Sequence, residues 1–253
     1  MQSVMIALVV GTLTFTLGIA GHYLRRALPE QHMRTGSKEM IGALVGLVSL
    51  LLALVLGTLI GSAYATYATQ RANVETLCAR ALELDLAFRQ FGADANPLRD
   101  RLRSSMKDAY DAIWGKGDFY GQQFDPSVYM RRFEQWNTTV ANLSAKTPAQ
   151  TRLLGAIVAD STSYQQTRIL TSLELAGSVS WPLIIVIASW AMLLFFGHGI
   201  LAGVNGTSAS ALGLGSVAVA SAIFLILQLS QPYAGVFRVP AGSIERTLAA
   251  LAS

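Results

Sequence analysis

The sequence predicts an all-α membrane protein with four transmembrane helices and a large helical insert between the second and the third. First, four apolar runs are each long enough to cross a hydrocarbon core of ~30 Å at 1.5 Å per residue. Second, only 13% of the 253 residues are charged, whereas soluble proteins have roughly 25%. Third, the polar residues gather in one segment, 68–176, where no stretch alternates like a strand.

The first two helices fill residues 1–67. Residues 4–24 carry no charge and are followed by Arg25 and Arg26, with no Lys or Arg before them. A cleaved signal peptide has the opposite arrangement, so we expect a retained transmembrane helix. The second helix covers about Met40–Tyr67 and is expected to extend out of the membrane into the insert.

The last two transmembrane helices lie within residues 177–232. The third begins at Trp181-Pro182, where a proline suits the first helical turn and a tryptophan suits the membrane interface. The fourth covers about Ala209–Leu229. Residues 233–253 are then left as a C-terminal tail.

The insert, residues 68–176, is predicted to be an extramembrane helical domain. Six apolar residues alternate at spacings of three and four, which indicates a heptad seam: Val74, Leu77, Ala81, Leu84, Phe88 and Phe91. Further helices are expected after Asn96-Pro97, after Asp125-Pro126, and after a capping box at Thr147–Gln150. The last of these could continue into the third transmembrane helix.

A stripe of small residues runs along the second transmembrane helix, with Gly57 and Gly61 at its centre. Such a stripe lets helices approach closely in lipid, or it lines a pore in an oligomer with hydroxyls facing the ions and apolar residues forming a constriction. The residues that are candidates for one or the other role are Leu52, Val55, Gly57, Thr58, Leu59, Gly61, Ser62, Ala65, Thr66 and Thr69.

Several function classes have little support. No block of Lys and Arg tracks a phosphate backbone, so we expect no nucleic-acid partner. The single cysteine, Cys78, excludes a Cys-based zinc site, and the three histidines lack the spacing of metal ligands. We therefore expect no metal, no cofactor and no enzymatic activity.

The segment FLILQLSQPYAGVFRV resembles the closing signature of the bacterial bestrophin-like membrane family. Ser230 and Gln231 stand where that family usually has an Asp-Arg pair. The second apolar run and the segment RANVETLCARALELD resemble the family more weakly. The candidate signature residues are Gln228, Ser230, Pro232, Tyr233, Gly235 and Arg238.

The resemblance implies a multi-pass protein of the bacterial inner membrane, in contact with lipid. Bestrophins are pentameric ion channels, so it also implies a homo-pentamer that passes small ions through a pore lined by the second helix, anions more readily than cations. The phenylalanine-rich neck and the acidic calcium clasp of bestrophins are missing here, so calcium gating is not implied. The alternative is a non-conducting scaffold or sensor whose helical domain binds a partner.

The side of the membrane on which the insert lies is open. The resemblance places residues 68–176 in the cytosol. Arg25 and Arg26 favour a cytoplasmic first loop, which would place the insert in the periplasm. Similar numbers of Lys and Arg flank the spans on both sides, so the positive-inside rule does not decide.

Overall fold

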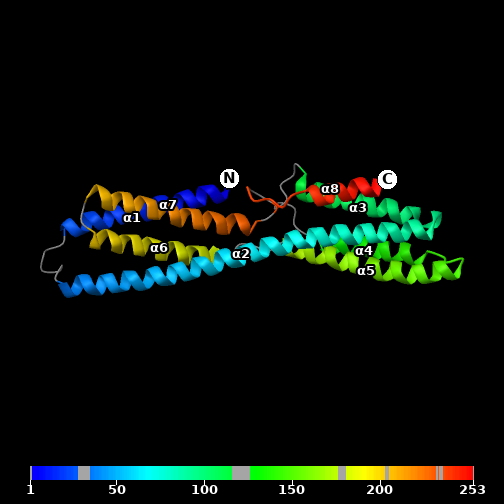
Figure 1. The fold of residues 1–253 in the computed structure, drawn as a ribbon, viewed down its shortest axis with the longest axis horizontal. Coiled ribbons are helices and arrows are strands. Elements are labelled where there is room, and N and C mark those ends of the chain that lie inside the picture. The colour runs from blue at the N-terminus through cyan, green and yellow to red at the C-terminus, as the bar shows by residue number, and fades with distance from the viewer. Residues whose placement is uncertain are drawn as a thin grey trace. The chain divides into compact units, whose positions relative to one another are not determined.

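A computed structural model of the chain describes residues 2–27, 35–115, 126–175, 181–202, 205–231, 233 and 236–252. These residues form helices and connecting turns (Figure 1). The elements are α1 (Gln2–Ala27), α2 (Thr35–Phe91), η2 (Ala93–Ala95), α3 (Asn96–Trp114), α4 (Pro126–Ala141), α5 (Pro148–Leu175), α6 (Trp181–Leu201), α7 (Gly206–Leu229) and α8 (Gly242–Ala252).

The chain forms two compact units. One contains residues 1–67 and 179–237, and the other contains residues 68–178 and 238–253. Helices α1, α2, α6 and α7 are long and apolar enough to cross a membrane, and they lie where the four transmembrane helices are expected. Helix α2 has 57 residues, whereas a span needs about 20, so it contributes to both units. The expected continuity of the insert with the third transmembrane helix concerns residues 176–180, which lie outside the described residues.

Glycines position α1 in the first unit. Helix α1 packs closely against both α6 and α7. A Cβ added at Gly21 would collide with the carbonyl oxygen of Phe196, and one added at Gly199 would collide with that of Gly18. These glycines therefore let the two backbones touch, as small residues do where helices meet in lipid.

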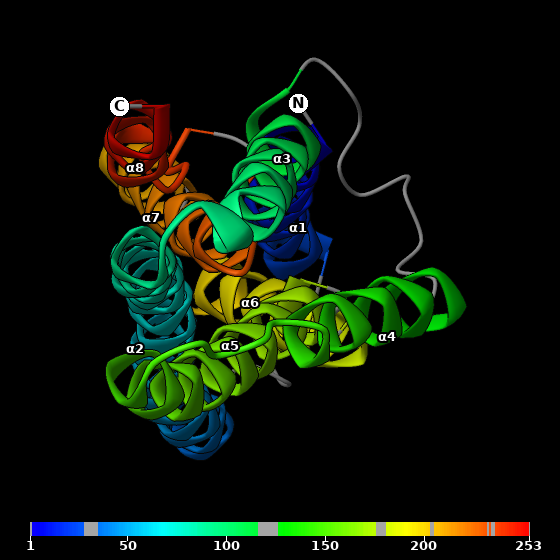
Figure 2. The same cartoon turned by 90° about the vertical axis from the view of Figure 1, so that its right-hand side faces the viewer.

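The second unit is a bundle around the far part of α2. All six residues of the predicted heptad seam are buried, with Ala81, Leu84 and Phe88 fully enclosed. Trp136 of α4 packs between the rings of Phe88 and Tyr164, at centroid distances of 6.2 and 6.1 Å. Figure 2 views the helices of this unit nearly end-on. The seam predicted from the sequence thus forms the core of the bundle.

Two helix starts follow the sequence closely. Helix α3 begins at Asn96 and α5 at Pro148. The Thr147 hydroxyl accepts a hydrogen bond from the Gln150 N–H at 3.1 Å, as in a capping box. The Gln150 side chain accepts a hydrogen bond from the backbone N–H of Lys146 at 2.8 Å. In a standard capping box this bond would come from the N–H of Thr147, one residue later.

The C-terminal segment carries a helix that we did not predict. Helix α8 packs against α3 and buries Ile244, Thr247 and Leu251. Residues 238–253, which the sequence analysis leaves in a tail, therefore contribute to the second unit.

Candidate pore-facing helix and signature segment

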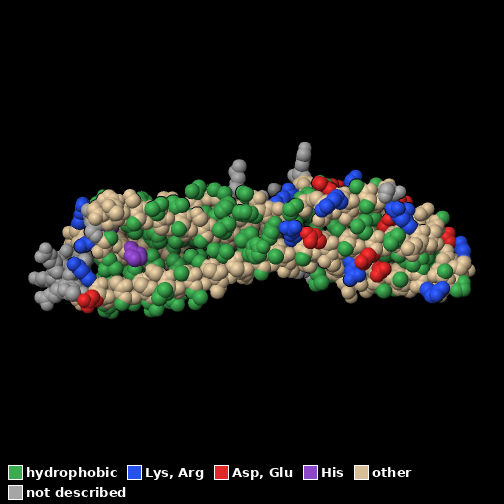
Figure 3. Space-filling view, in the orientation of Figure 1, with side chains coloured by type: hydrophobic (Ala, Val, Ile, Leu, Met, Phe, Trp, Pro, Cys, Tyr) green, Lys and Arg blue, Asp and Glu red, His purple; other side chains and the backbone are tan. Residues whose placement is uncertain are grey.

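Helix α2 is the least buried of the four apolar helices within the chain. In its most apolar stretch 11% of the residues are buried, against 28% in α1 and 33% in α6 and α7. Figure 3 shows hydrophobic side chains over the surface of the first unit, with charged ones gathered at one end of it. One side of α2 is thus available to lipid or to another protein.

The side of α2 that is covered faces α6. Leu52 is buried in a cluster with Ile187, Ala191 and Phe195. Val55 and Leu59 pack against the same cluster and are half-buried. Within one chain, these three candidates therefore pack against a neighbouring helix.

The other candidates are exposed within the chain, and Gly57 and Gly61 lie on the side turned away from α6. An α-helix has 3.6 residues per turn, which places Gly61 half a turn from Leu52. A Cβ added at Gly57 or at Gly61 would meet nothing within 4 Å, so neither glycine serves close packing within the chain. The exposed candidates are Gly57, Thr58, Gly61, Ser62, Ala65, Thr66 and Thr69.

From Gly57 to Thr69 the exposed positions of α2 are mostly small or hydroxyl-bearing and uncharged, whereas Leu50 and Leu54 make the preceding turns of the uncovered side apolar. The Thr58 hydroxyl donates to the carbonyl of Val55 at 2.9 Å, and the Thr66 hydroxyl donates to that of Ser62 at 3.1 Å. Each hydroxyl oxygen donates its proton to its own helix and can still accept a hydrogen bond. No Asp, Glu, Lys or Arg occurs from residue 40 to residue 70. The face can therefore contact a partly hydrated ion without holding it tightly.

The signature segment turns the chain at the end of α7. The buried Gln228 side chain accepts a hydrogen bond from the backbone N–H of Val236, eight positions later, at 2.9 Å. The Ser230 hydroxyl donates to the carbonyl of Ile226 at 2.7 Å, and Tyr233 is buried. Pro232 and Gly235 lie outside the described residues.

Arg238 binds the end of α3. Its Nη2 donates to the carbonyl of Ile113 at 2.6 Å. A cation is favourable there because the last carbonyls of a helix lack partners and carry its negative dipole end. Beside it, the Trp114 indole donates to the carbonyl of Val239 at 2.9 Å. Arg238 thus anchors the chain that leads to α8.

A family model for the Bestrophin-like domain matches residues 12–244. The chain belongs to the Bestrophin-like family. The match includes the whole signature segment and nearly all of the four apolar helices, so the family assigned from that segment is confirmed. No curated protein and no solved structure matches the chain.

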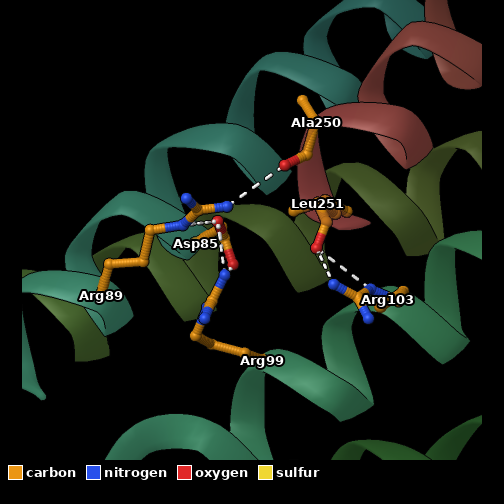
Figure 4. A network of polar contacts seen from close by, with 6 residues as sticks. All are labelled: Asp85, Arg89, Arg99, Arg103, Ala250 and Leu251. Carbon is orange, nitrogen blue, oxygen red and sulfur yellow. Dashed lines mark hydrogen bonds and ion pairs between the residues drawn. The ribbon is translucent and has the colours of Figure 1, made fainter. Parts of the chain in front are cut away.

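The Bestrophin-like chain also contains an ionic network that sequence reasoning missed. In the second unit, the buried Asp85 carboxylate binds Arg89 Nε at 2.6 Å and Arg99 Nε at 2.8 Å. Arg89 donates to the carbonyl of Ala250 at 3.2 Å, and Arg103 donates to that of Leu251 (Figure 4). The arginines thus neutralise one buried acid and bind the C-terminal end of α8. The i, i+4 spacing of Asp85 and Arg89 was the available signal.

The second unit holds two tyrosines with altered acidity. A hydrogen bond to the Glu245 carboxylate, at 3.1 Å, raises the pKa of Tyr110. Burial raises the pKa of Tyr164, whose hydroxyl lies 3.2 Å from that of Ser105. Both phenols stay neutral well above physiological pH. Among the described residues, no three His, Cys, Asp or Glu side chains gather as metal ligands.

Proposed function

We propose that this Bestrophin-like protein is a homo-oligomeric ion channel of the bacterial inner membrane, with α2 lining the pore. One observation carries the proposal. Between Gly57 and Thr69, α2 exposes a set of small and hydroxyl side chains, with nothing within 4 Å of Gly57 and Gly61. A ring of copies, five by resemblance to bestrophins, would bring these faces together around a shared axis.

The chemistry of that face suits conduction. Permeation requires binding that is favourable enough for an ion to enter and weak enough for it to leave. Thr58 and Ser62, hydroxyl residues near Gly61 around the helix, can replace part of a hydration shell, and no Asp, Glu, Lys or Arg between residues 40 and 70 would hold an ion tightly. Lys and Arg are absent there too, so the preference for anions rests on the resemblance to bestrophins. The same resemblance favours a cytosolic helical domain.

Flux through liposomes tests this function. Purified protein should admit chloride faster than empty vesicles do, and Gly61→Phe should abolish the flux by filling the pore. Leu214→Phe is the matched control because Leu214 is 75% exposed on α7, away from α2's uncovered face. A monomeric particle, or flux equal to that of empty vesicles, contradicts the proposal.

A scaffold or sensor is the second candidate, and one observation favours it. Leu82 and Leu86 of α2 are 40% and 56% exposed in the helical domain, outside the apolar run. Cysteines at these two positions should cross-link to other copies if the protein is a channel with parallel α2 helices. Cross-links to a different protein, without ion flux, would favour the scaffold.

A further inference from the structure

A groove lies between α6 and α7 in the first unit. It encloses about 540 Å³, within the usual range of ligand pockets. It forms because α1 packs closely against both helices, while α6 and α7 contact each other little. Residues that line it include Leu194, His198 and Leu201 of α6, and Ser208, Ala211 and Gly215 of α7.

The groove is apolar at one end and polar at the other. Helix α6 ends at Leu201 and α7 begins at Gly206, so His198 and Ser208 lie toward the short connection, and Leu194 and Gly215 lie deeper in the spans. The Ser208 hydroxyl donates to Asn205 Oδ1 at 2.6 Å and keeps its lone pairs. The exposed His198 ring supplies a second polar group at that end. A ligand with an apolar tail and a polar head matches this order.

One positive side chain, that of Arg25, lies beside the polar end. Arg25 donates through Nη1 to the carbonyl of Leu201 at 2.9 Å, which places its guanidinium beside a residue of the groove wall. Its other N–H groups can serve a ligand. In the described part of the first unit, the charged side chains are Arg25, Arg26, Lys38 and Glu39. All four flank the connection between α1 and α2. Three of them are positive and one is negative, so their net positive charge favours an anion.

We propose that this groove binds an anionic phospholipid of the surrounding bilayer. One acyl chain would lie along Leu194, Ala211 and Gly215, and the phosphate would meet Arg25, His198 and Ser208. Basic pockets between transmembrane helices bind anionic head groups in this way. His198 and Ala211 of the walls are exposed within the chain, so lipid can reach the groove from that side. This inference holds whether or not the protein conducts ions.

Native mass spectrometry of the purified protein tests the site. The protein is titrated with phosphatidylglycerol or with phosphatidylcholine carrying the same acyl chains. Wild type should retain phosphatidylglycerol more strongly, and Ala211→Phe should lose that lipid by filling the groove. Val217→Phe is the matched control because Val217 is exposed on α7 and does not line the groove. The proposal is overturned if the two variants retain phosphatidylglycerol equally well. It is also overturned if the wild-type protein retains the two lipids equally well.

A second pair of variants tests the contact with the lipid head group. Arg25→Gln should weaken phosphatidylglycerol binding about fivefold, since one basic residue near an anionic head group contributes about that factor. Arg26→Gln removes the same charge from the exposed neighbour and should have a smaller effect. Equal weakening by the two variants would show that general surface charge, and not the groove, binds the lipid, which overturns the proposal. A disulfide between two copies that carry His198→Cys would also overturn it, because the groove would then face another copy. Circular dichroism verifies that each variant is folded.

Discussion

The two halves of α2 form one continuous helix but differ in how far their apolar side chains are buried within the chain. Residues 68–91, in the second unit, bury Leu84 and Phe88 completely in a heptad seam. The half that belongs to the first unit buries Leu52 and leaves Leu50 and Leu54 73% and 64% exposed. The difference shows that the second half packs within its own chain, while the first half has a side that is left to lipid or to another protein.

The contrast follows from the solvent around each half. Water drives apolar residues together, so an alternating apolar seam in the second unit finds partners within the chain. Lipid tails are as apolar as leucine, so exposed leucines in a span need no partner. Small residues and hydroxyls at Gly57–Thr69 are not needed for lipid contact, which is why this face suits a pore.

The largest expected effect separates the two halves directly. Leu84→Ala should lower the free energy of unfolding by about 2–5 kcal/mol, because it leaves a cavity in a fully buried site. The same change at Leu54 should stay within about 0.5 kcal/mol, since the residue faces outward. Thermal unfolding in detergent, followed by circular dichroism, measures both. A similar loss at the two positions would show that the first half also has a closely packed partner.

The ionic network should come next in size. Asp85→Asn leaves Arg89 and Arg99 without their carboxylate and should cost about 2 kcal/mol, less than for a fully buried pair because both arginines partly reach solvent. Glu83→Gln is the control, since the Arg80–Glu83 pair is exposed and such pairs contribute little. Urea unfolding of both variants makes the comparison. Equal effects would mean that Asp85 is no more than a surface charge.

Two glycines distinguish a position where helices pack closely from one on the uncovered side of α2. Gly21→Ala should destabilise the protein by about 1–3 kcal/mol, because the added methyl meets the α6 backbone. Gly61→Ala should be neutral or stabilise by about 0.5–1 kcal/mol, since alanine favours a helix and nothing lies nearby. Oligomer size after Gly61→Ala should be unchanged. Loss of assembly would show that the stripe packs tightly against another subunit.

The smallest effect is expected at the start of the second half. Gln70 is buried, and its Oε1 has no hydrogen-bond partner. Gln70→Leu should therefore raise the free energy of unfolding by about 1 kcal/mol. Gln90→Leu, on the exposed side, serves as control and should change little. A loss of stability at position 70 would indicate that a buried water satisfies the amide.

Periodic features were predictable from the sequence. Four apolar runs, the heptad seam and the helix starts at Asn96 and Pro148 follow from local composition and spacing. The candidate residues on α2 were visible too, but not which of them face α6. The facing side is set in part by Gly197 of α6, where the lack of a side chain leaves room for Val45 of α2. The sequence of α2 alone contains no sign of this contact.

Contacts distant in the chain were not predictable. Asp85 binds Arg99 across 14 positions, and Arg103 reaches Leu251 across 148. Each single residue resembles an ordinary helix-surface charge, and only the folded bundle brings them together. Gly18 and Gly199 meet for the same reason. Arg238, selected for its place in a family signature, instead acquires a physical role through Ile113.

Cysteine modification tests most directly whether the uncovered face of α2 lines a pore. Gly61→Cys and Ala63→Cys are made in a Cys78→Ala background and reconstituted into liposomes. Ala63 is the control because it is buried two residues away. A charged, membrane-impermeant thiol reagent should stop chloride flux through Gly61→Cys and leave Ala63→Cys conducting. Unchanged flux through a modified Gly61→Cys would contradict a pore on this face.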